Sequence, residues 1–555
     1  MSDEQDHPLG EGYDAYFRPG SEPRRASYED EPTHVSQAVA DEPVPEPRPV
    51  HPFTRSLGWT TLGAFLPGLG LLPTRLRKWG IGLFVLIMVS LVAVVIYVAR
   101  DPFEAAKLAT RTSDLLALCV ALVVLALLWV TLIVGTHLIT RPRRLTTAQR
   151  VVGAIAVGLL AFVVSTPLAV GARYSWDQAN LIKRVFGDND DKDSGTRPTI
   201  DTDRPSDEVW KQHPRLNILL VGLDQSAERE YSPTDVSTDT MMVASIDTQT
   251  GDMVLIQVPR NMAKTPFPPG SELAAIYPDG YTDGSGDNAA FFANAIWAHV
   301  PAEHPDLFTN TDYPGADALK LGMQGALGLK IDYFVALNID GLVGLIDAMG
   351  GVTLNVNERI PVASRSGQVA REYIEPGPNK KMSGYYAMWY ARSRAESTDF
   401  DRMSRQSCVI KAVINQADPQ TMLTRYEAIA RAGTNAVSTD IPSNMLPHLV
   451  DLAERVKDGS MSRVLFVHGQ NGYVTYEPDF EMMQRRIADA ITGLGGTPPD
   501  MPLVTPTPTP TMVPSSQTPT PTVTVSKPGD TPSTTETPTP KPIEDLDDAC
   551  AYNPK

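Results

Sequence analysis

The sequence predicts an α/β or α+β sandwich with a mostly covered central sheet, preceded by a helical transmembrane region. Strand-like and helix-like patterns alternate through residues 210–495, the one segment with the composition and length for a substantial core. Three apolar runs come before it, each long enough for the roughly 20 residues with which a helix crosses a bilayer. The net charge of −17 argues against a nucleic-acid partner, because phosphate backbones need a basic surface.

The three apolar runs cover residues 80–99, 115–138 and 151–172. A basic stretch, "TRLRKW", precedes the first run, and another, "TRPRRLTTAQR", separates the second from the third. Since basic flanks stay in the cytoplasm, we expect a multi-pass plasma-membrane protein with a cytoplasmic N-terminus and an extracytoplasmic domain. An earlier run at 57–73 is shorter and interrupted by glycine and proline, which predicts an interfacial or re-entrant hairpin.

Composition divides the chain further. The N-terminal segment is rich in proline and charged residues and is expected to be disordered, whereas a Pro/Thr-dominated segment near the C-terminus predicts an extended, solvated tail. The predicted segments are a disordered cytoplasmic tail (1–56), a membrane region with the hairpin and three transmembrane helices (57–175), a linker (176–209), the extracytoplasmic domain (210–495) and a Pro/Thr-rich tail (496–555).

Two of the three cysteines, Cys408 and Cys550, fall on the predicted outer side, where a disulfide can persist. A bond between them would tie the end of the Pro/Thr-rich tail back to the domain. Two free thiols are the alternative, and the sequence leaves both open. Cys119 lies within the second apolar run and is expected to be inert packing.

Within the domain the expected elements follow one another in a regular order. A buried strand, "RLNILLVGLD", precedes two strands joined by a turn at Gly251, "DTMMVASIDTQTGDMVLIQVPRN". The further expected strands are "KIDYFVALN", "VTLNVN" and "RVLFVHG". The expected helices are "ADALKLGMQGALG", "IDGLVGLIDAMGG", "SGYYAMWYARSR", "DFDRMSRQSCVIKAVINQ" (capped by Thr398 or Asp399), "SNMLPHLVDLAERV" and "FEMMQRRIADAITGL".

Four arginines lie in one short stretch, "YARSRAESTDFDRMSRQ", of this acidic chain. On a helix that begins at Asp399, Arg402 shares one face with Arg405 and Gln406. The planar guanidinium matches phosphate oxygens bidentately, so converging arginines predict a multiply anionic ligand such as a diphosphate. The alternative is a solvated face whose arginines form salt bridges with nearby acidic residues.

Acidic and basic residues also stand at the ends of predicted strands. Asp224 follows the first strand, Asp239 begins the second and Arg260 ends the third. Ligands gather at strand ends in α/β sheets, and two carboxylates there suit Mg²⁺, which prefers oxygen ligands and bridges to phosphates. The alternative is that Asp239 caps a turn and that Asp224 is an ordinary loop residue.

These motifs together resemble the LytR-CpsA-Psr family. "NILLVGLD", "TDTMMVASID", "VPRN", "IDYFVALNIDGLVGLIDAMGGVTLNV", "YARSR" and "DFDRMSRQ" occur in the order and spacing of that family, over about residues 215–420. The resemblance implies an α/β/α sandwich with a central mixed sheet and an apolar channel for a polyprenyl tail. It implies transfer of an anionic glycopolymer from a polyprenyl-diphosphate carrier to peptidoglycan, on the outer face of the plasma membrane, with a wall-facing tail.

The resemblance also assigns roles to individual residues. Two aspartates match the family's magnesium-associated positions, Asp224 and Asp239. Five residues match the positions that grip the diphosphate, Arg260, Arg392, Arg394, Arg402 and Gln406. Arg405 is expected to be structural. Mg²⁺ would offset the remaining phosphate charge, because phosphoryl transfer depends on positioning and charge stabilisation.

Two positions depart from the family pattern. Ser237 stands where the family usually has arginine, and Asn261 stands where it usually has aspartate. The first change removes a fixed positive charge and the second removes a carboxylate, with Arg229 a candidate to supply the missing charge. Two alternative functions therefore accompany transfer: a catalytically weak scaffold that binds polyprenyl phosphate or wall polymer, and a pyrophosphatase that hydrolyses the lipid diphosphate.

Apolar residues of the fourth strand and the following helix have two interpretations. They either line the polyprenyl channel or pack in the core, and core is the commoner fate of such residues. The set comprises Phe334, Leu342, Leu345, Ile346 and Met349.

Overall fold

A computed structural model describes residues 52–101, 107–187, 193–224, 236–285, 288–364, 369–416, 437–496 and 541–554. The predicted disordered tail up to residue 51, Arg229 and the Pro/Thr-rich residues 497–540 lie outside the described residues.

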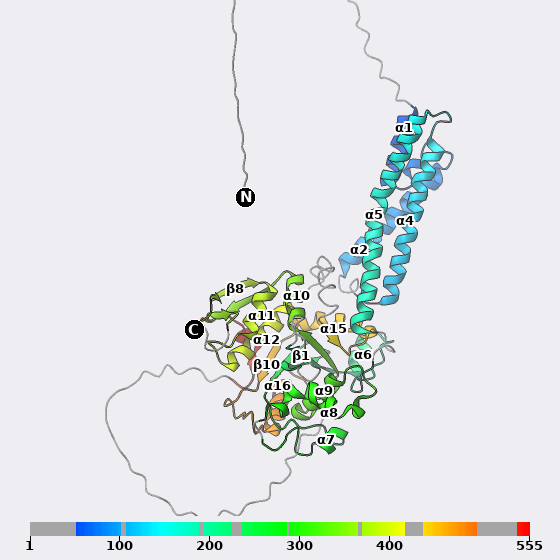
Figure 1. The fold of residues 1–555 in the computed structure, drawn as a ribbon. Coiled ribbons are helices and arrows are strands. Elements are labelled where there is room, and N and C mark those ends of the chain that lie inside the picture. The colour runs from blue at the N-terminus through cyan, green and yellow to red at the C-terminus, as the bar shows by residue number, and fades with distance from the viewer. Residues whose placement is uncertain are drawn as a thin grey trace, which may run out of the picture. The chain divides into compact units, whose positions relative to one another are not determined.

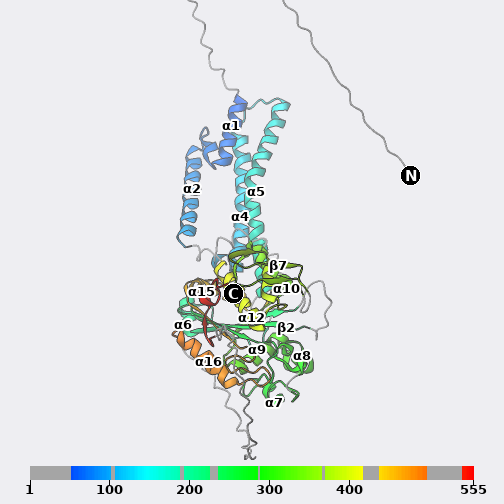
Figure 2. The ribbon, with the colours of Figure 1, turned by 90° about the vertical axis from the view of Figure 1, so that its left-hand side faces the viewer.

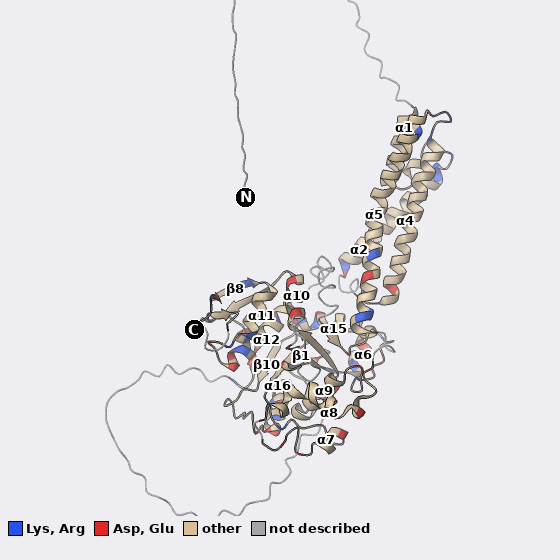
Figure 3. Cartoon of the chain, viewed as in Figure 1, with Lys and Arg blue, Asp and Glu red and all other residues tan. Residues whose placement is uncertain are grey.

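The N-terminal part of the described chain is helical. Its elements are α1 (Pro52–Phe65), η1 (Leu69–Leu71), α2 (Arg77–Arg100), α4 (Thr112–Thr140) and α5 (Thr147–Phe186). By length and composition α2, α4 and α5 can each cross a membrane, and they contain the three predicted runs. Figure 3 shows these helices almost free of charged side chains along their middle parts.

Helix α1 and η1 form the hairpin-like segment before α2. Helix α1 runs antiparallel to α4, since Thr60 lies beside His137 and the indole Nε1 of Trp129 donates a hydrogen bond to the Ala64 carbonyl. The chain then turns back at Gly68, whose φ of 94° favours glycine. A Cβ on Gly68 would collide with the carbonyl oxygen of Gly80 on α2.

Helix α5 continues past the predicted end of the third run at residue 172. Its later residues bury one face at helical spacing, including Ser175, Ala179 and Ile182. Ala179 and Ile182 pack with Leu115 of α4. An amphipathic stripe of this kind is what keeps a helix folded beyond its apolar part, so α5 occupies the first part of the predicted linker.

The remaining elements form the domain. Its strands are β1 (Arg215–Leu223), β2 (Thr238–Asp247), β3 (Met253–Val258), β4 (Tyr333–Asn338), β5 (Val352–Val356), β6 (Ile360–Val362), β7 (Glu372–Ile374), β8 (Gly377–Met382), β9 (Val437–Thr439), β10 (Met461–Leu465) and β11 (Glu544–Asp545). Its helices are α6 (Ser206–Gln212), α7 (Glu272–Ile276), η3 (Ala289–Phe291), η4 (Ala293–Ala295), α8 (Ile296–Glu303), η5 (Pro305–Phe308), α9 (Pro314–Leu327), α10 (Ile339–Met349), α11 (Gly384–Arg392), α12 (Asp399–Gln416), η6 (Ser443–Met445), α15 (Leu446–Asp458), α16 (Phe480–Gly493) and α17 (Leu546–Ala549).

The central sheet has the strand order β11-β10-β3-β2-β1-β4-β9. Strands β1, β2 and β3 are successive antiparallel neighbours, whereas β1 pairs with β4 and β3 pairs with β10 in parallel. The sheet is therefore mixed, as the resemblance implies. Smaller two-stranded sheets, β5-β8 and β6-β7, lie outside it.

Helices cover both faces of the central sheet, which confirms the predicted α/β/α sandwich (Figures 1 and 2). Alternate residues of each strand serve opposite faces: Met241 and Val243 of β2 pack with α8, α9 and α16, while Met242 and Ala244 pack with α6 and α15. Two cores of this kind fix the register of the sheet and hence the position of every strand end.

Residues 541–554 are folded onto the domain, although they fall in the predicted tail. Strand β11 pairs with the edge strand β10, and Cys550 forms a disulfide with Cys408 of α12. The docking combines backbone pairing, a disulfide, ion pairs and the burial of Leu546, and these contacts with distant residues leave no local pattern in the sequence.

Candidate functional site

A mostly apolar pocket lies between the central sheet and helices α10, α11 and α12. Its apolar lining comprises Leu220, Val221, Leu223, Met242, Val335, Leu337, Ile339, Leu342, Met388, Ala391, Val409 and Ile410. Its polar lining comprises Asp224, Asp239, Thr240, Asn338, Arg392, Arg402 and Gln406. The pocket therefore combines an apolar channel with charged groups, which suits an amphiphilic ligand.

Asp224 and Asp239 come together because of the β1–β2 register. Gly222 pairs with Thr240 but Leu223 pairs with Thr238, so Asp239 is the extra residue of a bulge opposite the end of β1. Asp224 follows Leu223 directly, and its backbone N–H donates to the Ser237 carbonyl. Both aspartates line the pocket. The Arg392 guanidinium donates to the Asp224 carboxylate at 3.0 Å, and Arg260 is ion-paired with Asp239.

Arg402 is the most buried of the predicted ligand-gripping arginines, with 5% of its surface exposed. Its Nη2 lies 2.8 Å from Asp399 Oδ1, but its Nε finds no hydrogen-bond partner among the described residues. Burial lowers the pKa of the Arg402 guanidinium, and the nearby positive charges of Arg394 and Arg260 act in the same direction. A buried guanidinium with an unpaired N–H beside a pocket would be stabilised by an anion that accepts a hydrogen bond there.

Arg394 and Arg260 are more exposed and are not among the pocket-lining residues. Arg394 Nη1 lies 3.7 Å from Asp399 Oδ1, the carboxylate that Arg402 also contacts. Arg260 reaches the pocket through its ion pair with Asp239. The structure therefore gathers all four predicted arginines around one edge of the pocket, two lining it and two flanking it.

Gln406 is held by the sheet. Its Oε1 accepts a hydrogen bond from Gln257 Nε2 at 2.7 Å, and its Nε2 donates to Thr240 Oγ1 at 3.1 Å. Ser407 in turn donates to Gln257 Oε1. The network fixes α12 over β2 and β3. Gln257 and Thr240 were not among the predicted site residues, although Thr240 shares the pocket-facing side of β2 with Met242 by strand alternation.

Arg405 is positioned quite differently from Arg402. Its Nε donates to the Tyr390 carbonyl at 2.7 Å, its Nη2 donates to the Ser393 carbonyl, and its Nη1 pairs with Glu358 at 3.1 Å. These acceptors bracket the end of α11, where Arg392 lies. Arg405 therefore has a structural role, as expected, because it ties α12 to the end of α11.

The helix that carries Arg402 is capped as one of the two alternatives predicts. Thr398 Oγ1 accepts from the Asp401 backbone N–H, while the Asp401 carboxylate accepts from the Thr398 backbone N–H. This reciprocal pair has the pattern of a capping box. Asp399 is then available for Arg402 and Arg394.

Ser237, one of the two departures from the family pattern, lies across the ladder from the end of β1, because its carbonyl accepts a hydrogen bond from the Asp224 backbone N–H. Asn294 donates from Nδ2 to Ser237 Oγ at 2.8 Å, and its backbone N–H donates to the Arg260 carbonyl. A neutral amide–hydroxyl pair thus occupies the position where the family arginine is absent. Asn294 was not predicted, because it lies more than fifty residues from Ser237 in the sequence.

Only one of the five candidate channel residues lines the pocket. Leu342 does, but Phe334 is fully buried on the opposite face of the sheet, against Trp297 and Tyr313. Phe334 thus has the second of the two interpretations, core packing, and strand alternation explains it, because Val335 and Leu337 of β4 line the pocket. Ile346 and Met349 belong to a separate core under α10, and Leu345 is not part of the lining.

The pair of carboxylates fits a magnesium ion that a phosphate ligand completes. Mg²⁺ is usually bound through one or two carboxylates together with substrate phosphates. Asp224 and Asp239 supply that pair at one edge of the pocket. No group of three or more histidine, cysteine or acidic residues suited to a metal occurs in the described part of the chain, so the phosphate oxygens would have to supply the other ligands.

Comparison with known proteins assigns the fold and the site to a family. The LytR_cpsA_psr family model matches residues 185–490, and this chain belongs to that family. The match contains the pocket, all seven predicted site residues and every strand of the central sheet except β11.

Several relatives with assigned names are similar over part of this chain. It is 25% identical over 302 residues to the polyisoprenyl-teichoic acid–peptidoglycan teichoic acid transferase TagU of Oceanobacillus iheyensis, covering 53% of this chain and 80% of that protein. It is 25% identical to biofilm regulatory protein A of Streptococcus mutans and 27% identical to the probable cell wall biosynthesis protein LcpB of Corynebacterium glutamicum. These two matches cover 44% and 45% of this chain, and about half of each relative, 54% in both cases.

Solved structures are similar at lower identity. The structure of TagT bound to LI-WTA is 15% identical, with a TM-score of 0.33, covering 56% of this chain and 98% of that one. The structure of Bacillus subtilis TagV is 20% identical, with a TM-score of 0.34, covering 51% and 98% respectively.

Proposed function

We propose that this protein transfers an anionic glycopolymer from a polyprenyl-diphosphate carrier to peptidoglycan, forming a phosphodiester bond during cell wall assembly. The observation that carries the proposal is Arg402, a buried guanidinium with an unused Nε–H at the charged end of an apolar pocket. A polyprenyl diphosphate matches both parts, since its tail is apolar and its head group is multiply anionic. The name of the relative TagU supports the same chemistry.

In the proposed reaction a peptidoglycan hydroxyl oxygen attacks the phosphorus that bears the glycopolymer. The new P–O bond forms as the bond to the bridging oxygen breaks, the hydroxyl proton is released, and polyprenyl monophosphate leaves with the bridging oxygen. Arg392 and Arg402 would bind the diphosphate from two helices, with Arg260 and Arg394 flanking them. Fixed donors of this kind stabilise the charge that develops on the phosphoryl oxygens.

A magnesium ion is part of the proposal. Asp224 and Asp239 would hold it, and it would supply charge neutralisation at the phosphate oxygens. Each aspartate is paired with an arginine, Arg392 or Arg260, in this structure. Binding of the diphosphate would let each arginine exchange its carboxylate partner for a phosphate oxygen.

The proposed location is the plasma membrane, with a cytoplasmic N-terminus and an extracytoplasmic catalytic domain. Three helices that can span a membrane and the basic stretches beside them support this topology. The disulfide between Cys408 and Cys550 also supports an oxidising, external location for the domain.

The test uses full-length protein in detergent or liposomes, a labelled polyprenyl-diphosphate-linked glycopolymer, and peptidoglycan. The proposal expects label to join peptidoglycan covalently and polyprenyl monophosphate to appear in equal amount. Monophosphate without labelled peptidoglycan would instead identify a pyrophosphatase. Binding of the lipid with neither product would identify a scaffold.

The scaffold is the second candidate, and the pair of Ser237 with Asn294 is the observation that favours it. This neutral pair replaces a positive charge that would face the diphosphate. A scaffold needs only ground-state binding, whereas transfer needs extra stabilisation in the transition state. Product formation under the conditions above would exclude it.

A further inference from the structure

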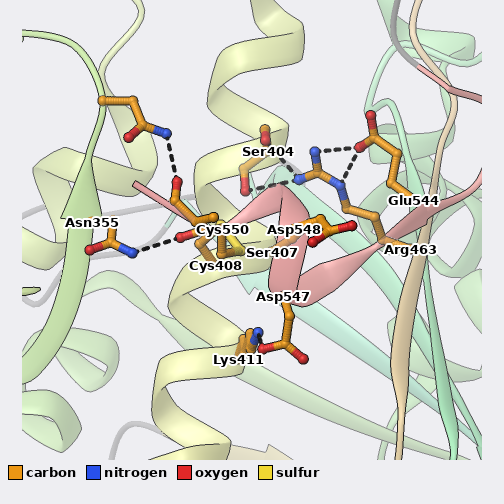
Figure 4. The surroundings of a disulfide bond; sticks show 12 residues. Asn355, Ser404, Ser407, Cys408, Lys411, Arg463, Glu544, Asp547, Asp548 and Cys550 are labelled. Atoms are coloured by element: carbon orange, nitrogen blue, oxygen red, sulfur yellow. Dashed lines mark hydrogen bonds and ion pairs between the residues drawn. A yellow bond between two sulfur atoms is a disulfide. The ribbon is translucent and has the colours of Figure 1, made fainter. Parts of the chain in front are cut away.

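The C-terminal residues 541–554, which we call the C-terminal clasp, are attached to the domain on three sides (Figure 4). The clasp consists of β11, α17 and the residues that flank them. It follows the Pro/Thr-rich segment in the chain, so its position in the sequence gives no reason for it to lie beside the arginine cluster.

The first attachment is to the edge of the central sheet. Strand β11 pairs with β10, and Glu544 accepts hydrogen bonds from both Nε and Nη2 of Arg463 at 2.8 and 2.6 Å. Arg463 is almost fully buried, with 3% of its surface exposed. Without Glu544 this guanidinium would lose its carboxylate partner inside the protein, which is costly.

The second attachment is to α12, the helix that carries Arg402 and Gln406. Cys550 is bonded to Cys408, and Asp547 is ion-paired with Lys411. The other side of Arg463 donates from Nη1 to Ser404 Oγ at 2.7 Å. The clasp therefore contacts α12 directly at Cys408 and Lys411, which lie three residues apart on one face, and reaches Ser404 through Arg463 of β10.

The third attachment reaches α11, the helix that carries Arg392. Asn355 Nδ2 donates to the Cys550 carbonyl at 2.9 Å, and the Tyr390 hydroxyl donates to the Asn355 carbonyl at 3.0 Å. The clasp is thereby connected to both arginine-bearing helices, through one covalent bond and a short chain of hydrogen bonds.

We propose that the C-terminal clasp is a positioning element for the diphosphate-binding arginines, with Cys550 and Glu544 its principal residues. The inference rests on the proposed function, since it concerns the same site. Arg402 lines the pocket from one side of α12, while the clasp holds another side of the same two turns. A helix that is fixed on both sides cannot rotate or slide, so the guanidinium of Arg402 stays directed at the head group.

The test separates the head group from the lipid tail. Binding of two probes to the full-length protein is measured, a polyprenyl methylenediphosphonate, which cannot be cleaved, and the uncharged polyprenol of equal length. The variants are Cys408→Ser/Cys550→Ser and a chain that ends at residue 540. Measurements are made well below the melting temperature of each variant.

The proposal expects both variants to weaken diphosphonate binding about tenfold, as the loss of one charge-assisted hydrogen bond would, while polyprenol binding stays within about twofold. A synthetic peptide of residues 541–555, joined to Cys408 through a disulfide formed in the presence of oxidised glutathione, should restore diphosphonate binding to the shortened chain. Lys411→Ala, which removes only an ion pair with an exposed aspartate, is the matched control and should behave as wild type.

A lower melting temperature with unchanged binding of both probes would overturn the proposal, because the clasp would then be a stabilising feature alone. Equal loss of both probes would also overturn it, because the whole pocket would be affected. Failure of the proposed function has a different signature: the wild-type protein would bind the diphosphonate but release no monophosphate from the natural lipid. If the wild-type protein binds the diphosphonate and the polyprenol equally well, both the proposed function and the positioning role of the clasp are contradicted.

Discussion

Helix α12 presents two buried arginines, three residues apart, in opposite states. Arg402 is 5% exposed and has one carboxylate contact and an unused Nε, whereas Arg405 is 7% exposed and donates to two carbonyls, a hydroxyl and a carboxylate. Both arise from the same "DRMSRQ" sequence. Unmet hydrogen-bonding capacity, more than burial or residue type, therefore distinguishes the arginine that we propose to bind the ligand from the structural one.

The largest expected effect is on Arg402. Arg402→Met should lower the rate of monophosphate release by about a thousandfold, or ~4 kcal/mol, because a preorganised charge at the developing phosphoryl charge is lost. Its free energy of unfolding should change by less than ~1 kcal/mol, since methionine keeps the packing of the side-chain stem. Steady-state kinetics and denaturant unfolding measure the two effects. If the loss in free energy of unfolding exceeded the loss in activation free energy, Arg402 would be a structural arginine and not a ligand-binding one.

The matched substitution, Arg405→Met, should lower stability more than it lowers the activity of the folded protein. We expect a loss of ~3 kcal/mol in the free energy of unfolding, because the carbonyls of Tyr390 and Ser393 lose their donor. Burial lowers the pKa of the Arg405 guanidinium, and the negative charge of Glu358 opposes this shift. Urea unfolding measures the loss. A variant as stable as wild type would contradict the structural role.

Removal of magnesium should have an intermediate effect. Chelation by EDTA is expected to lower monophosphate release by about 30-fold, ~2 kcal/mol, because metal neutralisation of phosphate charge is lost while the arginines remain. Asp239→Asn should give a similar loss and little further response to EDTA. If EDTA does not change the rate of monophosphate release by the wild-type protein, magnesium has no part in the proposed reaction.

Ser237→Arg should sharpen the comparison by adding a positive charge at the position where the family pattern has arginine. We expect release to rise by roughly tenfold, if the serine weakens charge stabilisation at the diphosphate. Ser237→Ala is the control, since it removes the hydrogen bond from Asn294 without adding charge. Equal rates for wild type and Ser237→Arg would show that other groups already supply the charge.

The smallest expected effect is at Lys411, on the clasp side of the same helix. Its partner Asp547 is largely exposed, and exposed ion pairs contribute about 0–1 kcal/mol. Lys411→Ala should therefore lower the free energy of unfolding by less than ~1 kcal/mol and leave release unchanged. A loss comparable to that of Arg405→Met would mean that the two sides of α12 are not distinct.

Much of the fold was predictable because it is local. The short apolar run in "RLNILLVGLD" predicts one strand, the pattern of "DFDRMSRQSCVIKAVINQ" predicts one helix, and both elements are found. Arg402 and Gln406 could be placed on one helix face by their spacing. The meeting of Asp224 with Asp239 followed from strand ends that the sequence marks.

What the sequence did not predict depends on distant contacts. The spacing of Arg402 and Arg405 suggests one shared face, and only the position of α11 gives them different partners. Phe334 was a candidate for the channel because the sequence does not reveal which side of β4 faces α10. The clasp brings Cys550 to Cys408 across 142 residues, a pairing that the sequence left open.

The proposed role of Arg402 is tested most directly by one assay that compares wild type, Arg402→Met and Arg405→Met. The assay measures release of polyprenyl monophosphate from a polyprenyl-diphosphate substrate with Mg²⁺. Rates are expressed per folded molecule, using the unfolding curve of each variant. We expect polyprenyl monophosphate to be released by the wild type and by the folded fraction of Arg405→Met, and almost none to be released by fully folded Arg402→Met. Release by Arg402→Met at the wild-type rate would contradict the proposed role of Arg402, because the pocket's buried arginine would then have no part in the chemistry.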